Sequence, residues 1–267
     1  MSIREIIAQK DKPFNVKYRV NPTQKELREL ALKYIPTCLV SAYGNINRIT
    51  LRKARMEKFT YIIADESRAS EFSSAVMSPE RAEKYINLQR EFIESKGELI
   101  EIQGYYGIGE TAVPIQAFYT MEAANVAGMQ QVMMFSREEI EGPDWVEKEF
   151  KPVFKVVYTP GLELNDLPGK MAILVDLDYY VTYVINSDYF GESKKGILRM
   201  LNHYFYLRGG LVLHAGAKSV RINGKDYAVA ILGLSGTGKT TTTFVKHGEH
   251  SMPIQDDMIT LWPDGSY

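Results

Sequence analysis

Residues 227–241 read YAVAILGLSGTGKTT, and this stretch decides how the second half of the chain folds. Its first six residues are apolar and predict a β-strand. The next eight, Gly233 to Thr240, fit the pattern of a glycine, four residues of any type, a second glycine, a lysine, and a serine or threonine. Residues 240–246 are predicted to begin a helix. A strand, a glycine-rich loop and a helix in this order are typical of a loop that binds phosphate groups.

The residue types of this loop suit a triphosphate. Gly233, Gly236 and Gly238 permit positive φ angles, so that successive backbone N–H groups can converge on an anion. Lys239 brings a positive charge to the β- and γ-phosphates of a nucleoside triphosphate, and the Thr240 hydroxyl is a ligand for the Mg²⁺ that bridges them. A chance glycine-rich turn is the alternative, which the flanking strand and helix disfavour. The predicted nucleotide-binding residues are Gly233, Leu234, Ser235, Gly236, Thr237, Gly238, Lys239, Thr240 and Thr241.

A pair of carboxylates follows the loop. Asp256 and Asp257 come directly after a short apolar strand that is predicted to end near Gln255. A hard cation bound to a triphosphate prefers oxygen ligands. We therefore predict that Asp256 and Asp257, together with Thr240, hold the metal ion. A solvated acidic turn is the alternative.

Two further clusters precede the loop. Residues 189–196 read YFGESKKG, which places two adjacent lysines after a glycine turn and near the start of a helix predicted over 195–207. His214 ends a strand predicted over 211–214. On residue types alone, a solvated pair of lysines and a structural histidine are the better interpretations.

Strand and helix signals alternate along the rest of the chain. Thr23 is a helix N-cap, and Pro36 ends that helix; Ser78-Pro79 opens another helix that Gly97 ends. Asn223-Gly224 is a strong hairpin signal. Residues 1–20 and 104–109 are predicted to be irregular, residues 120–130 are predicted to be helical, and strands are predicted over 59–64, 99–103, 131–135, 153–158, 171–176, 180–185, 211–214 and 227–232. The pattern predicts an α/β fold, with a mixed-sheet N-terminal domain over 1–209 and an incomplete phosphate-loop domain over 210–267.

The composition of the 267 residues excludes several classes of protein. Apolar residues are 45% and charged residues 24%, as in soluble globular chains, and the net charge of −1 gives no sign of a nucleic-acid-binding protein. No apolar run approaches the roughly 18 residues of a membrane span, and charges occur too early in residues 1–10 for a secretory signal. The single cysteine, Cys38, cannot form an internal disulfide, so we expect a reducing, cytoplasmic compartment.

Four of these segments together resemble one enzyme family, the ATP-dependent phosphoenolpyruvate carboxykinases. Gly233–Thr241 resembles the kinase-1a motif of that family, and Gln255–Asp257 resembles its kinase-2 element. Tyr189–Gly196 resembles its tyrosine–glycine–glutamate–lysine–lysine segment, although Phe190 replaces the first of two glycines. Leu213–Ala217 resembles the strand that carries the family's metal-binding histidine. The order and approximate spacing of the four segments also agree.

The resemblance implies a reaction and a metal site. Members of the family convert oxaloacetate and ATP to phosphoenolpyruvate, CO₂ and ADP. A transition metal, usually Mn²⁺, holds the enolate and an oxygen of the γ-phosphate. By resemblance, the ligands of Mn²⁺ in this chain are Lys195 as a neutral amine, His214 and Asp257. Burial and the charge of the metal can lower the pKa of a lysine enough for this role.

The resemblance also implies how the substrate is held. Lys194 is expected to face the γ-phosphate or the enolate, and Tyr189 to line the site of the substrate or CO₂. Asn21-Pro22 resembles an element near the N-terminus of the family. Arg55 stands where the family has an arginine that clamps a carboxylate of the substrate. Arg52 competes with Arg55 for this role.

Members of the family continue beyond the two aspartates with a section that supplies the adenine pocket and a further catalytic arginine, whereas this sequence ends at Tyr267. We therefore expect the C-terminal half of the nucleotide domain to be missing and the chain alone to be inactive. Two other functions are open. One is a kinase on a related scaffold that phosphorylates a small molecule or a protein serine, and the other is a non-catalytic nucleotide-binding module.

Overall fold

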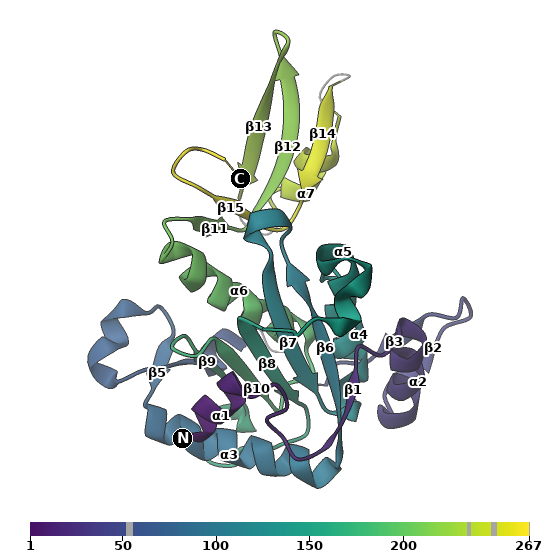
Figure 1. The fold of residues 1–267 in the computed structure, drawn as a ribbon, viewed down its shortest axis with the longest axis vertical. Helices are drawn as coiled ribbons and strands as arrows, with labels where there is room; N and C mark the ends of the chain where they lie inside the picture. Colours follow the sequence, from purple (N-terminus) through teal and green to yellow (C-terminus); the bar gives the residue numbers. More distant parts are fainter. Residues whose placement is uncertain (52–55, 234–235, 247–249, 267) are drawn as a thin grey trace. The chain divides into compact units, whose positions relative to one another are not determined.

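The computed structural model divides the chain into two compact units, Met1–Met200 and Leu201–Tyr267. Helices and a mixed sheet together confirm the predicted α/β class (Figure 1). The residues that the structure describes are 1–51, 56–233, 236–246 and 250–266.

The larger unit is built on one mixed sheet with the strand order β1-β6-β7-β8-β10-β9-β4-β5 (Figure 1). Neighbours β6 and β7 run antiparallel, as do β9 and β10, and the other neighbours are parallel. Every residue of β8, β9 and β10 is buried, as expected for a sheet that is covered on both faces. The strands are β1 (Lys17–Val20), β4 (Thr60–Ile63), β5 (Ala75–Met77), β6 (Glu98–Tyr106), β7 (Val113–Tyr119), β8 (Phe154–Thr159), β9 (Ala172–Asp176) and β10 (Val181–Ile185).

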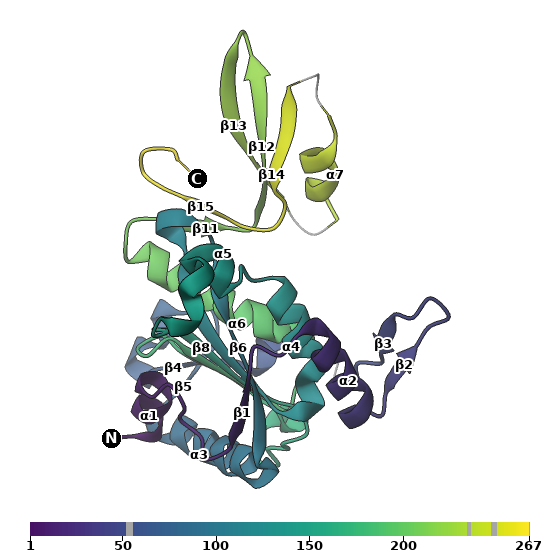
Figure 2. The ribbon, with the colours of Figure 1, turned by 45° about the vertical axis from the view of Figure 1, so that its right-hand side comes forward.

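Helices α1 and α3 cover one face of this sheet, and α4 and α6 cover the other (Figures 1 and 2). On the first face, Ile7 and Tyr85 share an apolar cluster with Phe118 of β7. On the second face, the hydroxyls of Tyr119 and Ser193 are 2.7 Å apart. The helices are α1 (Ile3–Gln9), α2 (Gln24–Tyr34), α3 (Pro79–Lys96), α4 (Ala124–Val132), α5 (Arg137–Glu141) and α6 (Phe190–Tyr206). A separate hairpin pairs β2 (Cys38–Val40) with β3 (Ile46–Arg48). Short 3₁₀ helices lie at Met56–Phe59, Glu66–Glu71, Gly109–Thr111, Met121–Ala123, Pro143–Glu147 and Pro168–Lys170.

The smaller unit holds an antiparallel sheet in the order β13-β12-β14 and a two-stranded ladder of β11 with β15. The short helix α7 lies beside this sheet (Figure 2). Asn223 and Gly224 both have positive φ, at 51° and 78°, which confirms the predicted hairpin turn. The elements are β11 (Leu211–Leu213), β12 (Ala215–Ile222), β13 (Lys225–Leu232), α7 (Lys239–Phe244), β14 (Ser251–Gln255) and β15 (Ile259–Leu261).

The caps predicted from sequence are confirmed. The Thr23 and Ser78 side chains accept hydrogen bonds from backbone N–H groups in the first turns of α2 and α3. Gly97 ends α3 in the left-handed conformation, with φ of 71°. The strands predicted over 153–158, 171–176 and 180–185 are also confirmed, with boundaries that differ by at most one residue.

The prediction of an irregular N-terminus was wrong, because residues 1–20 hold α1 and β1. Ser2 and Glu5 form a capping box, which satisfies backbone N–H groups at both positions. Arg4 then donates to both carboxylate oxygens of buried Asp176 on β9, at 2.7 and 2.9 Å. This ion pair joins residues far apart in sequence, so no local pattern reveals it.

Three other element predictions were also wrong. Strand β6 continues to Tyr106, into the first half of the segment 104–109 that was predicted as irregular, because β7 pairs with it along that length. Residues 131–135 are not a strand; α4 continues to Val132, and Phe135 makes only a single bridge to Tyr105. The hairpin partner of β13 is β12, not residues 211–214. The alanines and glycine at the start of β12 give a weak strand signal, and pairing on both sides makes it a strand.

Burial gives Lys155 of β8 a pH-dependent effect on stability. Its side chain is almost fully buried and donates to the carbonyl oxygens of Ile7 and Lys10, at 3.0 and 2.7 Å, at the C-terminal end of α1. Desolvation lowers the pKa of Lys155 to about 8, although the nearby carboxylates of Asp11 and Glu101 act in the opposite direction. The folded state therefore binds fewer protons than the unfolded state between pH 8 and the ordinary lysine pKa of 10.5.

We expect the free energy of unfolding to rise between pH 8 and 10.5 in the wild type relative to Lys155→Met, by up to roughly 3 kcal/mol. Burial raises the pKa of tyrosines such as Tyr119, Tyr158 and Tyr183, so near the top of this range they ionise only in the unfolded state; this effect is common to both proteins and cancels in the difference. Urea unfolding at several pH values measures the effect. Parallel pH profiles for the two proteins would contradict the assignment.

Candidate nucleotide and metal site

Three candidate segments of the smaller unit meet at one end of its sheet. Strands β13 and β14 run antiparallel to β12, so both end where β12 begins. Leu232 pairs with Ala215, and Gln255 pairs with Ala217. The segments that follow these strands, the phosphate loop and the two aspartates, therefore leave the sheet beside His214, which immediately precedes β12.

Two of the three loop glycines have the positive φ that the sequence predicts, whereas Gly233 does not. Gly236 and Gly238 have φ of 82° and 93°, which favours glycine. Gly238 is the N-cap of α7, and Lys239 is the first residue of that helix. The Lys239 ammonium donates to the Gly233 carbonyl at 2.8 Å, so its charge lies against the start of the loop. Leu234 and Ser235 lie outside the described residues.

Helix α7 is held against β12 by a close contact. Buried Thr243 donates from Oγ1 to the Lys239 carbonyl at 2.9 Å. The same oxygen lies where a Cβ on Gly216 would be, 1.9 Å from that position. Only glycine at residue 216 lets α7 approach β12 this closely. Thr240 and Thr241 are exposed on the first turn of α7.

The two aspartates sit in a turn that the Gln255 side chain shapes. Its Oε1 accepts from the backbone N–H groups of Asp256 and Asp257, at 2.7 and 3.0 Å. Asp256 Oδ1 is buried and has no hydrogen-bond partner in the described structure. A buried carboxylate oxygen of this kind is one that a bound cation or its water would satisfy.

Of the predicted metal ligands, the structure brings His214 and Asp257 together. His214 Nε2 lies 3.9 Å from Asp257 Oδ1, and both side chains are solvent-accessible. A ring nitrogen and carboxylate oxygens form a donor set that accepts Mn²⁺. Within the described residues, no group of three or more histidine, cysteine, aspartate or glutamate side chains is arranged around a common metal position. His214 and Asp257 are therefore two predicted metal ligands that the described part of the smaller unit brings within 4 Å of each other.

The larger unit brings Tyr189 and Lys195 together. Both lysines of the pair lie inside α6, which begins at Phe190, so the predicted glycine turn before them is wrong. Lys195 Nζ lies 5.9 Å from the centre of the Tyr189 ring and 3.7 Å from Oε1 of fully buried Glu192. The Tyr158 hydroxyl donates to the Tyr189 carbonyl at 3.1 Å, which fixes the backbone at the start of α6. Lys194 lies half-buried beside Lys195.

A groove of about 1020 Å³ in the larger unit leads to Tyr189. It is lined by α2, β3, α4 and the segment before α6, and its surface is mainly apolar. Sequence reasoning missed two of its charged residues, Arg48 and Asp188, whose side chains are largely buried and 3.6 Å apart. No motif surrounds Arg48 in the sequence. Arg52 and Arg55, the predicted carboxylate clamps, lie outside the described residues.

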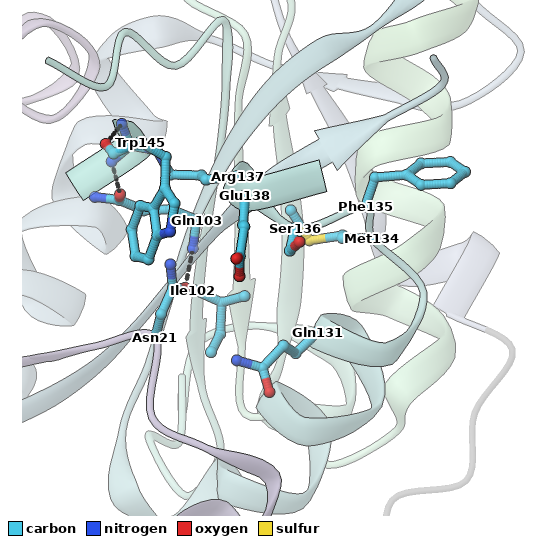
Figure 3. Close-up of a pocket in the computed structure, with 10 residues that line it drawn as sticks. All are labelled: Asn21, Ile102, Gln103, Gln131, Met134, Phe135, Ser136, Arg137, Glu138 and Trp145. Carbon is cyan, nitrogen blue, oxygen red and sulfur yellow. Dashed lines mark hydrogen bonds between the residues drawn. The ribbon is translucent and has the colours of Figure 1, made fainter. Parts of the chain in front are cut away.

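A smaller hollow of about 210 Å³ lies beside the start of α5 (Figure 3). Arg137 in its wall donates to both oxygens of Glu141, at 2.7 and 2.8 Å, and to Gln103 at 3.0 Å. It also donates to two backbone carbonyls, and its guanidinium lies 5.1 Å from the centre of the Trp145 ring. Arg137 uses its hydrogen-bond donors to hold α5 and the turn that follows it, so we assign no ligand to this hollow.

Comparison with known proteins decides the family. A family model described as phosphoenolpyruvate carboxykinase matches residues 16–267. The chain belongs to the phosphoenolpyruvate carboxykinase family. It is similar to the phosphoenolpyruvate carboxykinase (ATP) of Brevibacillus brevis, with 28% identity over 209 residues, which covers 74% of this chain and 38% of the relative.

Two further relatives carry the same name. The protein of Geobacillus thermodenitrificans is 26% identical over 197 residues, which covers 70% of this chain and 35% of the relative. The protein of Aeropyrum pernix is 40% identical over 98 residues, which covers 33% of this chain and 20% of the relative. The chain thus spans between a fifth and two fifths of the lengths of these carboxykinases. In the described part of the chain, no helix has the length and apolarity needed to cross a membrane.

The contact between Gly216 and Thr243 gives a direct test of how α7 is held. We expect Gly216→Ala to destabilise the smaller unit by about 1–3 kcal/mol, because a methyl group must displace Thr243. Hydrogen exchange at the Thr242 and Val245 amides, which bond within α7, measures the effect. The double variant Gly216→Ala/Thr243→Ala removes the clashing oxygen and should recover most of the protection. Unchanged protection in the single variant would show that α7 does not rest on Gly216.

Proposed function

We propose that the chain binds MgATP through residues 233–241 and takes part in the reaction of ATP-dependent phosphoenolpyruvate carboxykinases. In that reaction oxaloacetate loses CO₂, and the resulting enolate oxygen takes the γ-phosphoryl group to give phosphoenolpyruvate and ADP. The observation that carries the proposal is the meeting of the loop, His214 and Asp257 at one end of the β13-β12-β14 sheet. Family membership supports the choice of reaction.

Each loop residue has a role that its place supports. Lys239 lies against the loop and supplies a positive charge to the β- and γ-phosphates. Thr240 is exposed at the start of α7, where its hydroxyl can reach a cation on the phosphates. Backbone N–H groups along residues 233–239 provide the remaining contacts to the triphosphate.

The metal in this proposal is Mn²⁺ beside the Mg²⁺ of the nucleotide. When bound, it supplies positive charge to an enolate and to a γ-phosphate oxygen. His214 and Asp257 would hold it, and the buried Asp256 Oδ1 would accept a hydrogen bond from a water on the metal.

We propose that the substrate contacts come from the larger unit. Tyr189 presents its ring beside Lys195, and it borders the large groove. We propose that Lys194 contacts the enolate or the γ-phosphate, and that Arg55, or Arg52 in its place, binds a substrate carboxylate. Because the only cysteine is a free thiol, we also propose a reducing, cytoplasmic compartment.

Lys239→Ala tests the nucleotide site. Loss of a hydrogen-bonded charge on the phosphates should weaken MgATP binding by roughly 10- to 100-fold, measured by isothermal titration of the full chain. Lys246→Ala, which removes an exposed lysine just after α7, is the matched control and should keep the wild-type affinity. Equal affinities of wild type and Lys239→Ala would refute the assignment of the loop.

A further inference from the structure

We propose that Lys218 is a positioning residue for the phosphate loop. It holds the C-terminal end of α7, the end of that helix opposite to the loop, and does not touch the nucleotide. Lys218 lies in the middle of β12 and is 2% exposed. The inference rests on the proposed function, because it assigns Lys218 to the same nucleotide site.

The alternation of side chains along β12 directs Lys218 toward α7. Gly216 and Lys218 are two residues apart and share one face of the strand, and the Gly216 contact shows that this face meets α7. Ala215 and Ala217 point to the other face, where they pack with Ile259. The pairing of β12 with β14 shifts register between Ala217 and Lys218, so an irregularity of the sheet lies directly at this lysine.

The Lys218 ammonium donates hydrogen bonds to backbone carbonyls at the C-terminal end of α7. Its Nζ donates to the carbonyl oxygens of Thr242 and Val245, at 2.8 and 2.6 Å. The last carbonyls of an α-helix have no partner within the helix, and a cation there is stabilising. Helix α7 has only six residues, too few to persist without such support.

The contacts continue from Lys218 to the loop. The carbonyl of Thr242 accepts from Lys218, and the N–H of the same residue donates to the Gly238 carbonyl at 2.8 Å. Gly238 is the last residue of the loop and has φ of 93°. Lys239 follows it directly, so a change at the C-terminal end of α7 alters the position of both the loop and the phosphate-binding lysine.

The chain offers a matched control for this role. Lys155 is also a buried lysine on a central strand, and it also donates to two carbonyls at the C-terminal end of a short helix, α1. It lies in the larger unit, whereas the loop lies in the smaller one. Lys155→Met therefore removes the same kind of interaction without affecting α7.

The experiment compares the full-length wild type with Lys218→Met, Lys218→Arg and Lys155→Met. MgATP affinity is measured by isothermal titration at a temperature where circular dichroism shows all four proteins folded. Hydrogen exchange at the Thr242, Thr243 and Val245 amides is measured on the same samples without nucleotide. We expect Lys218→Met to lose protection at these amides and to bind MgATP roughly tenfold more weakly. Lys218→Arg should recover a large part of the amide protection and of the MgATP affinity. Lys155→Met should match the wild type in both quantities.

The possible failures point to different errors. If the wild type and Lys239→Ala bind MgATP equally, the proposed function fails, and the nucleotide part of this inference fails with it. If Lys239→Ala loses affinity but Lys218→Met does not, the site stands and Lys218 is not a positioning residue. If Lys218→Met lowers only the melting temperature, with wild-type affinity and exchange at 242–245, the lysine is merely structural and the inference is overturned.

Discussion

The close approach of α7 to β12 is the contact on which the candidate site depends. It requires that residue 216 carry no side chain, since the Thr243 hydroxyl occupies the space where a Cβ would lie. Strand β12 also pairs with β13 on one side and with β14 on the other. One strand therefore sets the position of the loop, of the helix that carries Lys239, and of the turn that carries Asp256 and Asp257.

The two units support their candidate residues in different ways. In the larger unit, a wide sheet covered on both faces holds the start of α6, and the carboxylate of Glu192 is fully buried between Lys195 and Arg199. In the smaller unit, the site residues are solvent-accessible and depend on short-range contacts. The Gln255 amide oxygen orders both aspartates, and Thr243 and Lys218 order α7. Small changes in this unit should therefore affect ligand binding more than overall stability.

Sequence reasoning succeeded where the chemistry is local. The glycines before Lys239 permit positive φ angles, and the structure has them at Gly236 and Gly238 but not at Gly233. Capping at Ser78 and Gly97 and the Asn223-Gly224 turn are equally local. The motif gave no sign of Lys218, because that residue reaches α7 across a sheet and belongs to no pattern around the loop.

Sequence reasoning failed where distant residues meet. Arg4 of helix α1 reaches Asp176 of β9, far along the sequence, and the extension of β6 depends on β7 beside it. The pairing of Arg48 with Asp188 joins the hairpin of β2 and β3 to the segment before α6, and neither residue stands in a recognisable motif. The approach of His214 to Asp257 could be inferred only through the family resemblance, since 43 positions separate them and only strand pairing brings them together.

The central claim is that one end of the β13-β12-β14 sheet is a joint site for a triphosphate and a divalent cation. Crystals of the chain grown with ATP and Mn²⁺ test it most directly, through an anomalous difference map recorded at the manganese edge. The account predicts a manganese peak within coordination distance of a His214 ring nitrogen and an Asp257 carboxylate oxygen, with the triphosphate along residues 233–239. A peak remote from both side chains, or a triphosphate bound outside the loop, would contradict it.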